Sequence, residues 1–184
     1  MIDVDDDEGF EQHRARFYSL IGHCVTGYQS IEDYLPELFG AALADDPSKA
    51  TAIFAVARGL EAKLDIISAA LIGADERHFS RWTELRPHIL LAAKARNQIA
   101  HASPTHHGGT IAIALNSNPE IAPKMTRTES SRMELRKRTR AGETVWTTDL
   151  MRAEYERSHK LFGHLIALAM ELRGEKPPSH LLEP

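Results

Sequence analysis

The chain has 184 residues, of which 42% are hydrophobic and 26% charged, and its formal net charge is −4. This length suits one domain, and the negative charge argues against a protein that coats nucleic acid without specificity. No stretch approaches the run of about 18 apolar residues that a membrane span needs, and the acidic N-terminus is unlike a signal peptide. The single cysteine, Cys24, excludes an internal disulfide, and its apolar neighbours indicate a packed thiol. We therefore expect a cytoplasmic protein that does not enter a membrane.

The first part of the chain is predicted to be a short leader followed by two helices. The first nine residues include five acidic side chains, so we expect a disordered acidic leader over residues 1–9. From Phe10 to about Leu43, apolar residues recur with helical spacing, although Pro36 is expected to kink this helix or begin a new one. A second helix is predicted from the start signal at Asp46–Ser48 to about Leu71, with Gly73 closing it.

The second part of the chain is predicted to contain two more helices around a β-insertion. A third helical region runs from about Glu76 to His101. β-branched residues and turn signals then predict a small β-insertion over about 109–147, with a hairpin near its end. A last helix extends to residue 173, and residues 174–184 form a C-terminal tail. We expect a mainly all-α protein, an antiparallel bundle of four to five helices over residues 10–173, with the small β-hairpin insertion before the last helix.

The apolar stripes of these helices predict the hydrophobic core. Positions that recur every three or four residues lie on one face of a helix, which packs against its neighbours. The main predicted core residues are Phe17, Tyr28, Ile31, Leu35, Ile53, Phe54, Leu64, Ile67, Phe79, Trp82, Ile89, Leu150, Leu161 and Leu165.

The most informative stretch lies at the end of the third helix. Arg96 falls on the apolar stripe, three residues before Ile99, so a carboxylate, a backbone carbonyl or a ligand phosphate has to satisfy its charge. Asn97 and His101 are four residues apart and share a helix face, whereas Arg96 and His101 are about 140° apart on a regular helix. Arg96 and His101 converge only if the helix ends or bends just before His101, or if a second subunit completes the site. This spacing favours a homodimer with a composite cleft.

These three residue types suit the cleavage of an RNA phosphodiester. Histidine titrates near neutral pH, so His101 can move the proton on the 2′-hydroxyl or on the leaving oxygen. Arginine stabilises charge that grows on the phosphoryl oxygens, which assigns that role to Arg96. The amide of Asn97 can orient the histidine or the phosphate. This chemistry requires no metal and no cofactor.

The stretch Arg96–His101 resembles the signature of the HEPN (higher eukaryotes and prokaryotes nucleotide-binding) superfamily. That signature is an arginine and a histidine separated by four to six residues, with a polar residue after the arginine. The surroundings are also similar, because the motif lies in the third of four main helices, with Trp82 and Leu85 upstream and Ile31–Glu32 midway along the first helix. As architecture, the resemblance covers residues 10–173.

The resemblance implies a dimeric helical bundle that binds RNA or nucleotide between its subunits. Many members are metal-independent endoribonucleases that act as toxins or defence effectors, some with an antitoxin or regulatory partner, and others are not catalytic. Carried over, Arg96 and His101 would be catalytic and Asn97 supporting. A toxin branch has a tyrosine two residues after the histidine as a site for nucleotide modification. This chain has Ser103 there, which argues against the tyrosine-modified mechanism.

Two weaker signals surround the motif. Glu32 is a candidate to orient Arg96, or it is a solvated carboxylate at the edge of the core. The locally basic segment 127–140 is either a solvated hairpin or a surface that holds the RNA backbone. The candidate RNA-contact residues within it are Arg132, Arg136, Lys137 and Arg138.

Alternatives to catalysis remain open from the sequence. Arg96 can form a structural ion pair with Glu32 or Asp65, while His101 only ends the helix. The bundle would then be a non-catalytic module that binds RNA, nucleotide or another protein. The histidines at 101, 106 and 107 have no carboxylate or cysteine at a recognisable ligand spacing, so no metal site is expected.

Overall fold

The computed structural model describes residues 5–43, 47–107, 111–114, 124–127, 132–139 and 142–182. Its helices are α1 (Asp5–Leu43), α2 (Pro47–Val56), α3 (Leu60–Ala70), α4 (Glu76–Ala100), α5 (Thr148–Leu172) and the 3-10 helix η1 (Ser179–Leu181). Its strands are β1 (Ser103–His107), β2 (Ile111–Ala114), β3 (Lys124–Arg127), β4 (Arg132–Thr139) and β5 (Gly142–Trp146). The fold is mainly helical, which confirms the predicted class.

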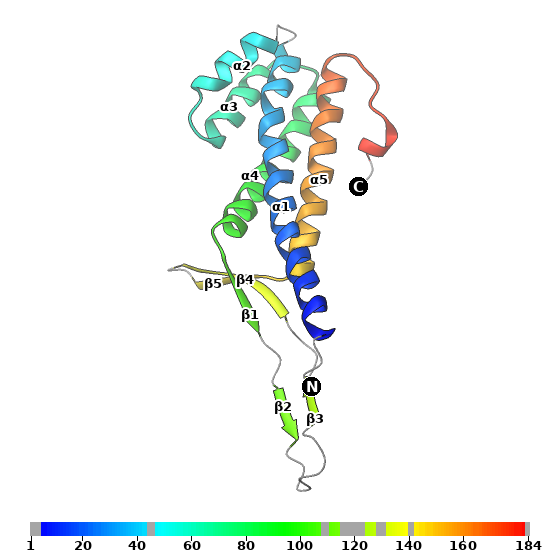
Figure 1. Ribbon diagram of the computed structural model, residues 1–184. Helices are drawn as coiled ribbons and strands as arrows, with labels where there is room; N and C mark the ends of the chain where they lie inside the picture. The colour runs from blue at the N-terminus through cyan, green and yellow to red at the C-terminus, as the bar shows by residue number, and fades with distance from the viewer. Residues whose placement is uncertain are drawn as a thin grey trace.

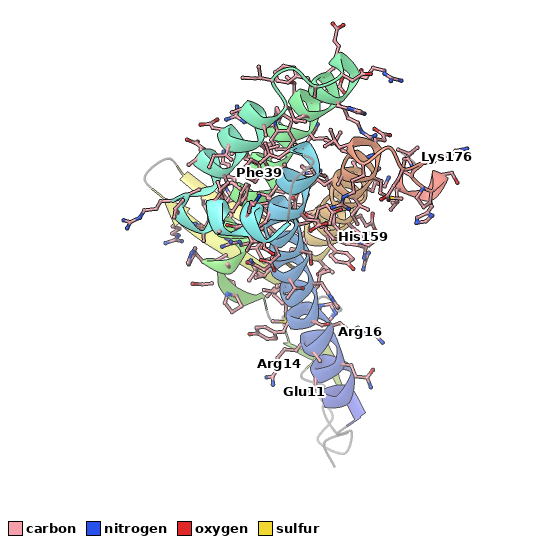
Figure 2. All side chains as sticks on the ribbon, turned by 90° about the horizontal axis from the view of Figure 1, so that it is seen from above. Glu11, Arg14, Arg16, Phe39, His159 and Lys176 are labelled. Carbon is pink, nitrogen blue, oxygen red and sulfur yellow. The ribbon has the colours of Figure 1, made fainter. Side chains whose placement is uncertain are left out.

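The long helices run side by side, with the short ones and the strands at opposite ends. In Figure 1, α1 and α5 lie together along the molecule, α2 and α3 cover one end, and the strands extend from the other. Seen from above in Figure 2, the N-terminal part of α1 carries the exposed Glu11, Arg14 and Arg16. Among the helices that the structure describes, none has a stretch long and apolar enough to cross a bilayer.

Two helix boundaries differ from the prediction. The first helix already begins at Asp5, so residues 5–9 are helical rather than part of a disordered leader. The predicted second helix is in fact two helices, because the chain turns at Gly59 with a φ of 85°. Only glycine adopts this backbone conformation at little cost. The turn brings the start of α3 back toward α1 and α4.

The strands form two antiparallel sheets. One has the order β1-β4-β5, and β2 pairs with β3 in the other. The hairpin of β4 and β5 confirms the predicted hairpin, with Leu135 opposite Trp146. Strand β1 begins at Ser103, before the predicted start of the β-insertion at about residue 109. Pro104 is compatible with this edge strand, where it lies opposite Leu135.

Buried side chains form two separate hydrophobic cores. The larger core is made by the helices alone, around Ile31, Leu64 and Ile89, all of which are 0% exposed. The smaller core joins helices to the sheet; its buried members are Phe17, Cys24, Ile99, Met133, Leu135 and Met151. Because Ile99 lies in the last turn of α4, this second core fixes the end of α4 against β4.

Three residues that the apolar stripes placed in the core are exposed instead. These are Ile53 on α2, Phe79 on α4 and Leu150 on α5. Phe79 and Leu150 lie in the first turns of their helices, and Ile53 lies on the short α2. Helix ends extend beyond their neighbours, so a stripe predicts burial less well there than in the middle of a helix.

Candidate functional site

Helix α4 carries the sequence motif, and its ends are well defined. Asp75 accepts a hydrogen bond from the backbone N–H of Arg77 and caps the start of α4. Further along, Ala92 and Ile99 are buried on either side of Arg96 in the sequence. Arg96 therefore leaves the helix from its buried face, as the stripe predicts. Its side chain is 27% exposed, so the guanidinium lies at the boundary of the core.

Three contacts hold the guanidinium of Arg96. Its central carbon lies 5.0 Å from the centroid of the Tyr28 ring. Nη2 lies 3.6 Å from Oε2 of Glu32, and Nη1 donates to Oδ1 of Asn97 at 2.9 Å. Within the part of the chain that the structure describes, its buried Nε has no hydrogen-bond partner. The side chain is thus oriented by an aromatic face, a carboxylate and an amide, and the remaining N–H groups of Nη1 and Nη2 can donate to a ligand.

Glu32 lies between two cations. Lys63 of α3 donates to Oε1 of Glu32 at 3.1 Å, on the opposite oxygen from the one that faces Arg96. The sequence left Glu32 and Asp65 open as partners for Arg96. In the structure Arg96 pairs with Glu32, whereas Asp65 pairs with Arg86. A carboxylate shared by two cations is held in place better than one that faces a single mobile side chain.

The phenol beneath Arg96 stays neutral at physiological pH. Burial, followed by the charge of Glu32, raises the pKa of Tyr28 to about 12, although Arg96 acts in the opposite direction. A neutral ring presents the negative face of its quadrupole to the guanidinium, and such a contact contributes about 0.5–1 kcal/mol or more when it is desolvated.

These residues border a cleft of about 720 Å³ between α1, the α2–α3 turn and α4. Its cationic side chains are Arg58, Lys94, Arg96 and Lys137, and its acidic ones are Glu32 and Glu61. Lys137 comes from β4 and donates to the carbonyl oxygen of Asn97 at 3.3 Å. That carbonyl lies in the last turn of α4, where helix carbonyls lack partners within the helix. The sheet therefore contributes a lysine to the cleft and caps the helix with it. The excess of cations suits a phosphate group.

His101 does not join this cleft within one chain. Helix α4 ends at Ala100, and His101 is the C-cap, with φ −110° and ψ 10°. Its side chain is exposed and is absent from the residues that line the cleft. The structure brings together Arg96, Asn97 and Glu32 and leaves the histidine outside, at the end of the same helix.

The basic segment contributes less than its sequence indicates. Arg136 binds Glu134 at 3.0 Å and Glu143 at 3.2 Å, and Arg138 also binds Glu143 at 3.2 Å. These acidic residues lie on β4 and β5, beside the arginines or opposite them, so much of the positive charge is compensated. Of the four predicted RNA-contact residues, Lys137 lines the cleft and Arg136 and Arg138 do not. The side chain of Arg132 lies outside the described residues, as do those of His106 and His107.

Some cleft residues were not predicted from the sequence. Arg58 and Glu61 come from the turn between α2 and α3 or the start of α3, which we predicted to be continuous helix, and Lys63 of α3 contacts the cleft residue Glu32. Gly59 was the available signal, because a glycine between two helical patterns permits a turn. Tyr28 was expected in the core, and the cation–π contact with Arg96 adds a second role.

Cys24 lies apart from this cleft and is the packed thiol that we expected. Its side chain is 3% exposed, and Sγ donates to the carbonyl of Met151 at 3.2 Å. Burial, with a smaller effect from Glu154, raises the pKa of the thiol to about 11. A thiol that is neutral and buried is a poor nucleophile.

No family model matches this chain, and neither a curated protein nor a solved structure matches it.

Proposed function

We propose that this protein is a metal-independent endoribonuclease of HEPN type that acts as a homodimer. The observation that carries the proposal is the state of Arg96. Its guanidinium is fixed on Tyr28 and Glu32 at the wall of a cleft rich in cations, and its side chain is 27% exposed there. A preorganised arginine with a free donor is suited to bind a phosphoryl oxygen and to stabilise charge on it.

Each residue then has a distinct role. Arg96 binds the scissile phosphate, Glu32 and Tyr28 position Arg96, and Lys137 attracts the RNA backbone. His101 accepts the proton of the 2′-hydroxyl as the 2′-oxygen attacks phosphorus, or protonates the 5′-oxygen as the P–O5′ bond breaks. The products are a 2′,3′-cyclic phosphate and a 5′-hydroxyl.

The position of His101 supports the proposal of a homodimer. This side chain is exposed at the C-cap of α4, outside the cleft that contains Arg96 of the same chain. A second copy of α4 placed across a two-fold axis would bring a histidine to that cleft. The site would therefore combine Arg96 of one subunit with His101 of the other.

The direct test incubates end-labelled RNA with purified protein in the presence of a chelator. We expect the wild type to cleave and both Arg96→Ala and His101→Ala to lose cleavage. Arg152→Ala, which removes an exposed cation of α5 outside the cleft, is the matched control and should cleave normally. Equal cleavage by the wild type and both site variants, or no cleavage by any protein, would refute the proposal.

A second candidate is a non-catalytic module that binds RNA or nucleotide in the same cleft. It is favoured by the absence of His101 from the residues that line the cleft. This module would bind RNA without cutting it, Arg96→Ala would weaken binding, and His101→Ala would leave binding unchanged. Gel-shift and cleavage assays on the same samples separate the two functions.

A further inference from the structure

A second cleft lies between α4 and α5, and it involves none of the residues assigned above. It has a volume of about 400 Å³, and the side chains that line it are Arg81, Glu84, Leu85, His88, Arg157, Lys160, Leu161, His164 and Leu182. The chain after α5 turns back alongside that helix, as Figure 1 shows. This return is close, because a Cβ added at Gly163 would lie 3.5 Å from Cδ2 of Leu181. The C-terminal segment thus forms one edge of the cleft.

Basic side chains dominate the surroundings of His164. Its pKa is lowered, first by burial and then by the positive charges of Arg81, His88 and Lys160. The charged groups that shift this histidine come from both helices, and all of them oppose its protonation. Two histidines, two arginines and a lysine therefore meet at one cleft, and neither histidine contacts a carboxylate of the described residues.

Both arginines of the cleft are held in place by carboxylates. Arg81 donates to Glu171 at 2.6 Å, and Arg157 donates to Glu154 at 2.6 Å. A guanidinium has five N–H donors, so one bond to a carboxylate orients the group and leaves other donors for a ligand. Glu84 also lines the cleft and reduces its net charge. Because the cleft has a volume of about 400 Å³, it is better suited to a compact anion than to a long polyanion.

We propose that the α4–α5 cleft binds the phosphate monoester of a small molecule. Arg81, Arg157 and Lys160 would bind the phosphoryl oxygens, and His88 and His164 would add hydrogen bonds. The apolar side chains of Leu85, Leu161 and Leu182 would contact the organic part of the ligand. The volume lies within the range of about 300–1,000 Å³ that is usual for small-molecule sites. Among the described residues, no group of three metal-ligating side chains makes a divalent cation the better occupant.

The histidine gives this site a characteristic pH dependence. A dianion beside His164 reverses the repulsion that keeps the imidazole neutral, so binding raises its pKa and takes up a proton. Sulfate remains doubly charged between pH 6 and pH 8, so any change in its affinity over this range comes from the protein. We expect sulfate to bind more tightly at pH 6 than at pH 8, and His164→Gln to reduce this difference.

The experiment titrates the full chain with sulfate, inorganic phosphate and adenosine 5′-monophosphate by isothermal calorimetry. A 5′-phosphorylated RNA trinucleotide and its 5′-hydroxyl form are titrated in the same way. Tighter binding of the phosphorylated form would show that the cleft accepts the 5′-phosphate of an RNA end as well as that of a free metabolite. We expect Lys160→Glu to weaken binding about tenfold or more, which corresponds to about 1.4 kcal/mol. Lys176→Glu makes the same charge change on an exposed lysine outside the cleft and should bind as the wild type does.

The outcome is independent of the proposed ribonuclease. Arg96→Ala should leave the binding of phosphate to this cleft unchanged, even where it abolishes RNA cleavage. The proposal is overturned if none of the probes binds, if Lys160→Glu binds as tightly as the wild type, or if Arg96→Ala alone removes binding. Thermal unfolding of Lys160→Glu and His164→Gln checks that both variants are folded.

Discussion

Two clefts border α4, and positive charge is arranged differently in each. In the cleft of Arg96, cations and a carboxylate alternate, because Glu32 lies between Lys63 and Arg96. In the α4–α5 cleft, the charged groups that act on His164 are all basic. The first arrangement orients a side chain before any ligand arrives, as catalysis requires. In the second cleft, a bound anion would reduce the repulsion between these basic groups. We therefore propose that the first cleft positions a catalytic side chain and that the second cleft binds an anion.

The largest expected effect is a loss of RNA cleavage at the Arg96 cleft, with ligand binding at the α4–α5 cleft unchanged. Arg96→Lys keeps the charge but loses the planar fork that contacts Tyr28 and Asn97 together. We expect RNA cleavage to fall about 100-fold, as for the loss of one transition-state donor. Phosphate binding in the α4–α5 cleft should not change. Arg152→Lys is the matched control, and full cleavage by Arg96→Lys would contradict the role of the guanidinium.

A smaller effect is expected when the orienting carboxylate is neutralised. Glu32→Gln removes the charge that Arg96 and Lys63 share, while the shape of the side chain is kept. We expect cleavage to slow about tenfold, because a positioning residue contributes less than the group that contacts the phosphate. Single-turnover kinetics would show the loss in the rate of cleavage rather than in RNA affinity. An unchanged rate would show that Tyr28 and Asn97 suffice to hold Arg96.

The buried Glu154 links stability to the second cleft, because Arg157 donates to it. Burial raises the pKa of Glu154 above its ordinary value of 4.5, although Arg157 opposes this shift. A raised pKa means that the carboxyl stabilises the fold when protonated, and that this contribution is lost as pH rises through its folded pKa. Glu154→Gln imitates the protonated form and should be more stable than the wild type at pH 8.

We expect this gain to be about 1 kcal/mol, or about 2–4 °C in Tm, since one buried oxygen of Glu154 has no hydrogen-bond partner among the described residues. The gain should disappear below about pH 4.5, where the wild type is itself protonated. Thermal unfolding from pH 4 to pH 8 measures it. A variant that is less stable than the wild type at pH 8 would show that the ion pair with Arg157 outweighs the cost of burial.

The smallest effect concerns the link between the sheet and the Arg96 cleft. Lys137→Ala removes the bond to the carbonyl of Asn97 at the end of α4. We expect a loss of about 0.5 kcal/mol, which is typical of a cation at a helix C-terminus. RNA affinity should also fall slightly, and should depend less steeply on salt. Chemical denaturation measures the first effect. Unchanged stability would mean that the α4 terminus does not need the lysine.

The helices were predictable because their signal is local. An apolar stripe repeats within a few residues, so the burial of Ile31, Leu64 and Ile89 follows from spacing alone. The strand at Ser103–His107 was not predictable in this way, since its partner β4 begins many residues later. The turn at Gly59 depends on a backbone conformation that the stripe does not encode.

In the candidate site, too, the local signals could be predicted from the sequence, whereas the contacts between elements could not. Arg96 stood out because a cation on an apolar stripe needs a partner, and the structure supplies one. The choice of Glu32 over Asp65 depends on how α1, α3 and α4 pack, so spacing left it open. Part of the positive charge of the basic hairpin is compensated, because a carboxylate from outside the segment 127–140 comes to lie opposite an arginine when the strands pair. Glu143, opposite Arg138, is the example.

The most direct test of the composite site mixes two inactive variants. Arg96→Ala and His101→Ala are co-refolded or exchanged as subunits, and cleavage of labelled RNA is measured in chelator. A site that combines Arg96 of one subunit with His101 of the other is intact once in each mixed dimer, so the mixture should regain up to about a quarter of wild-type activity. An active wild type whose mixed variants stay inactive, with exchange verified, would contradict the composite site.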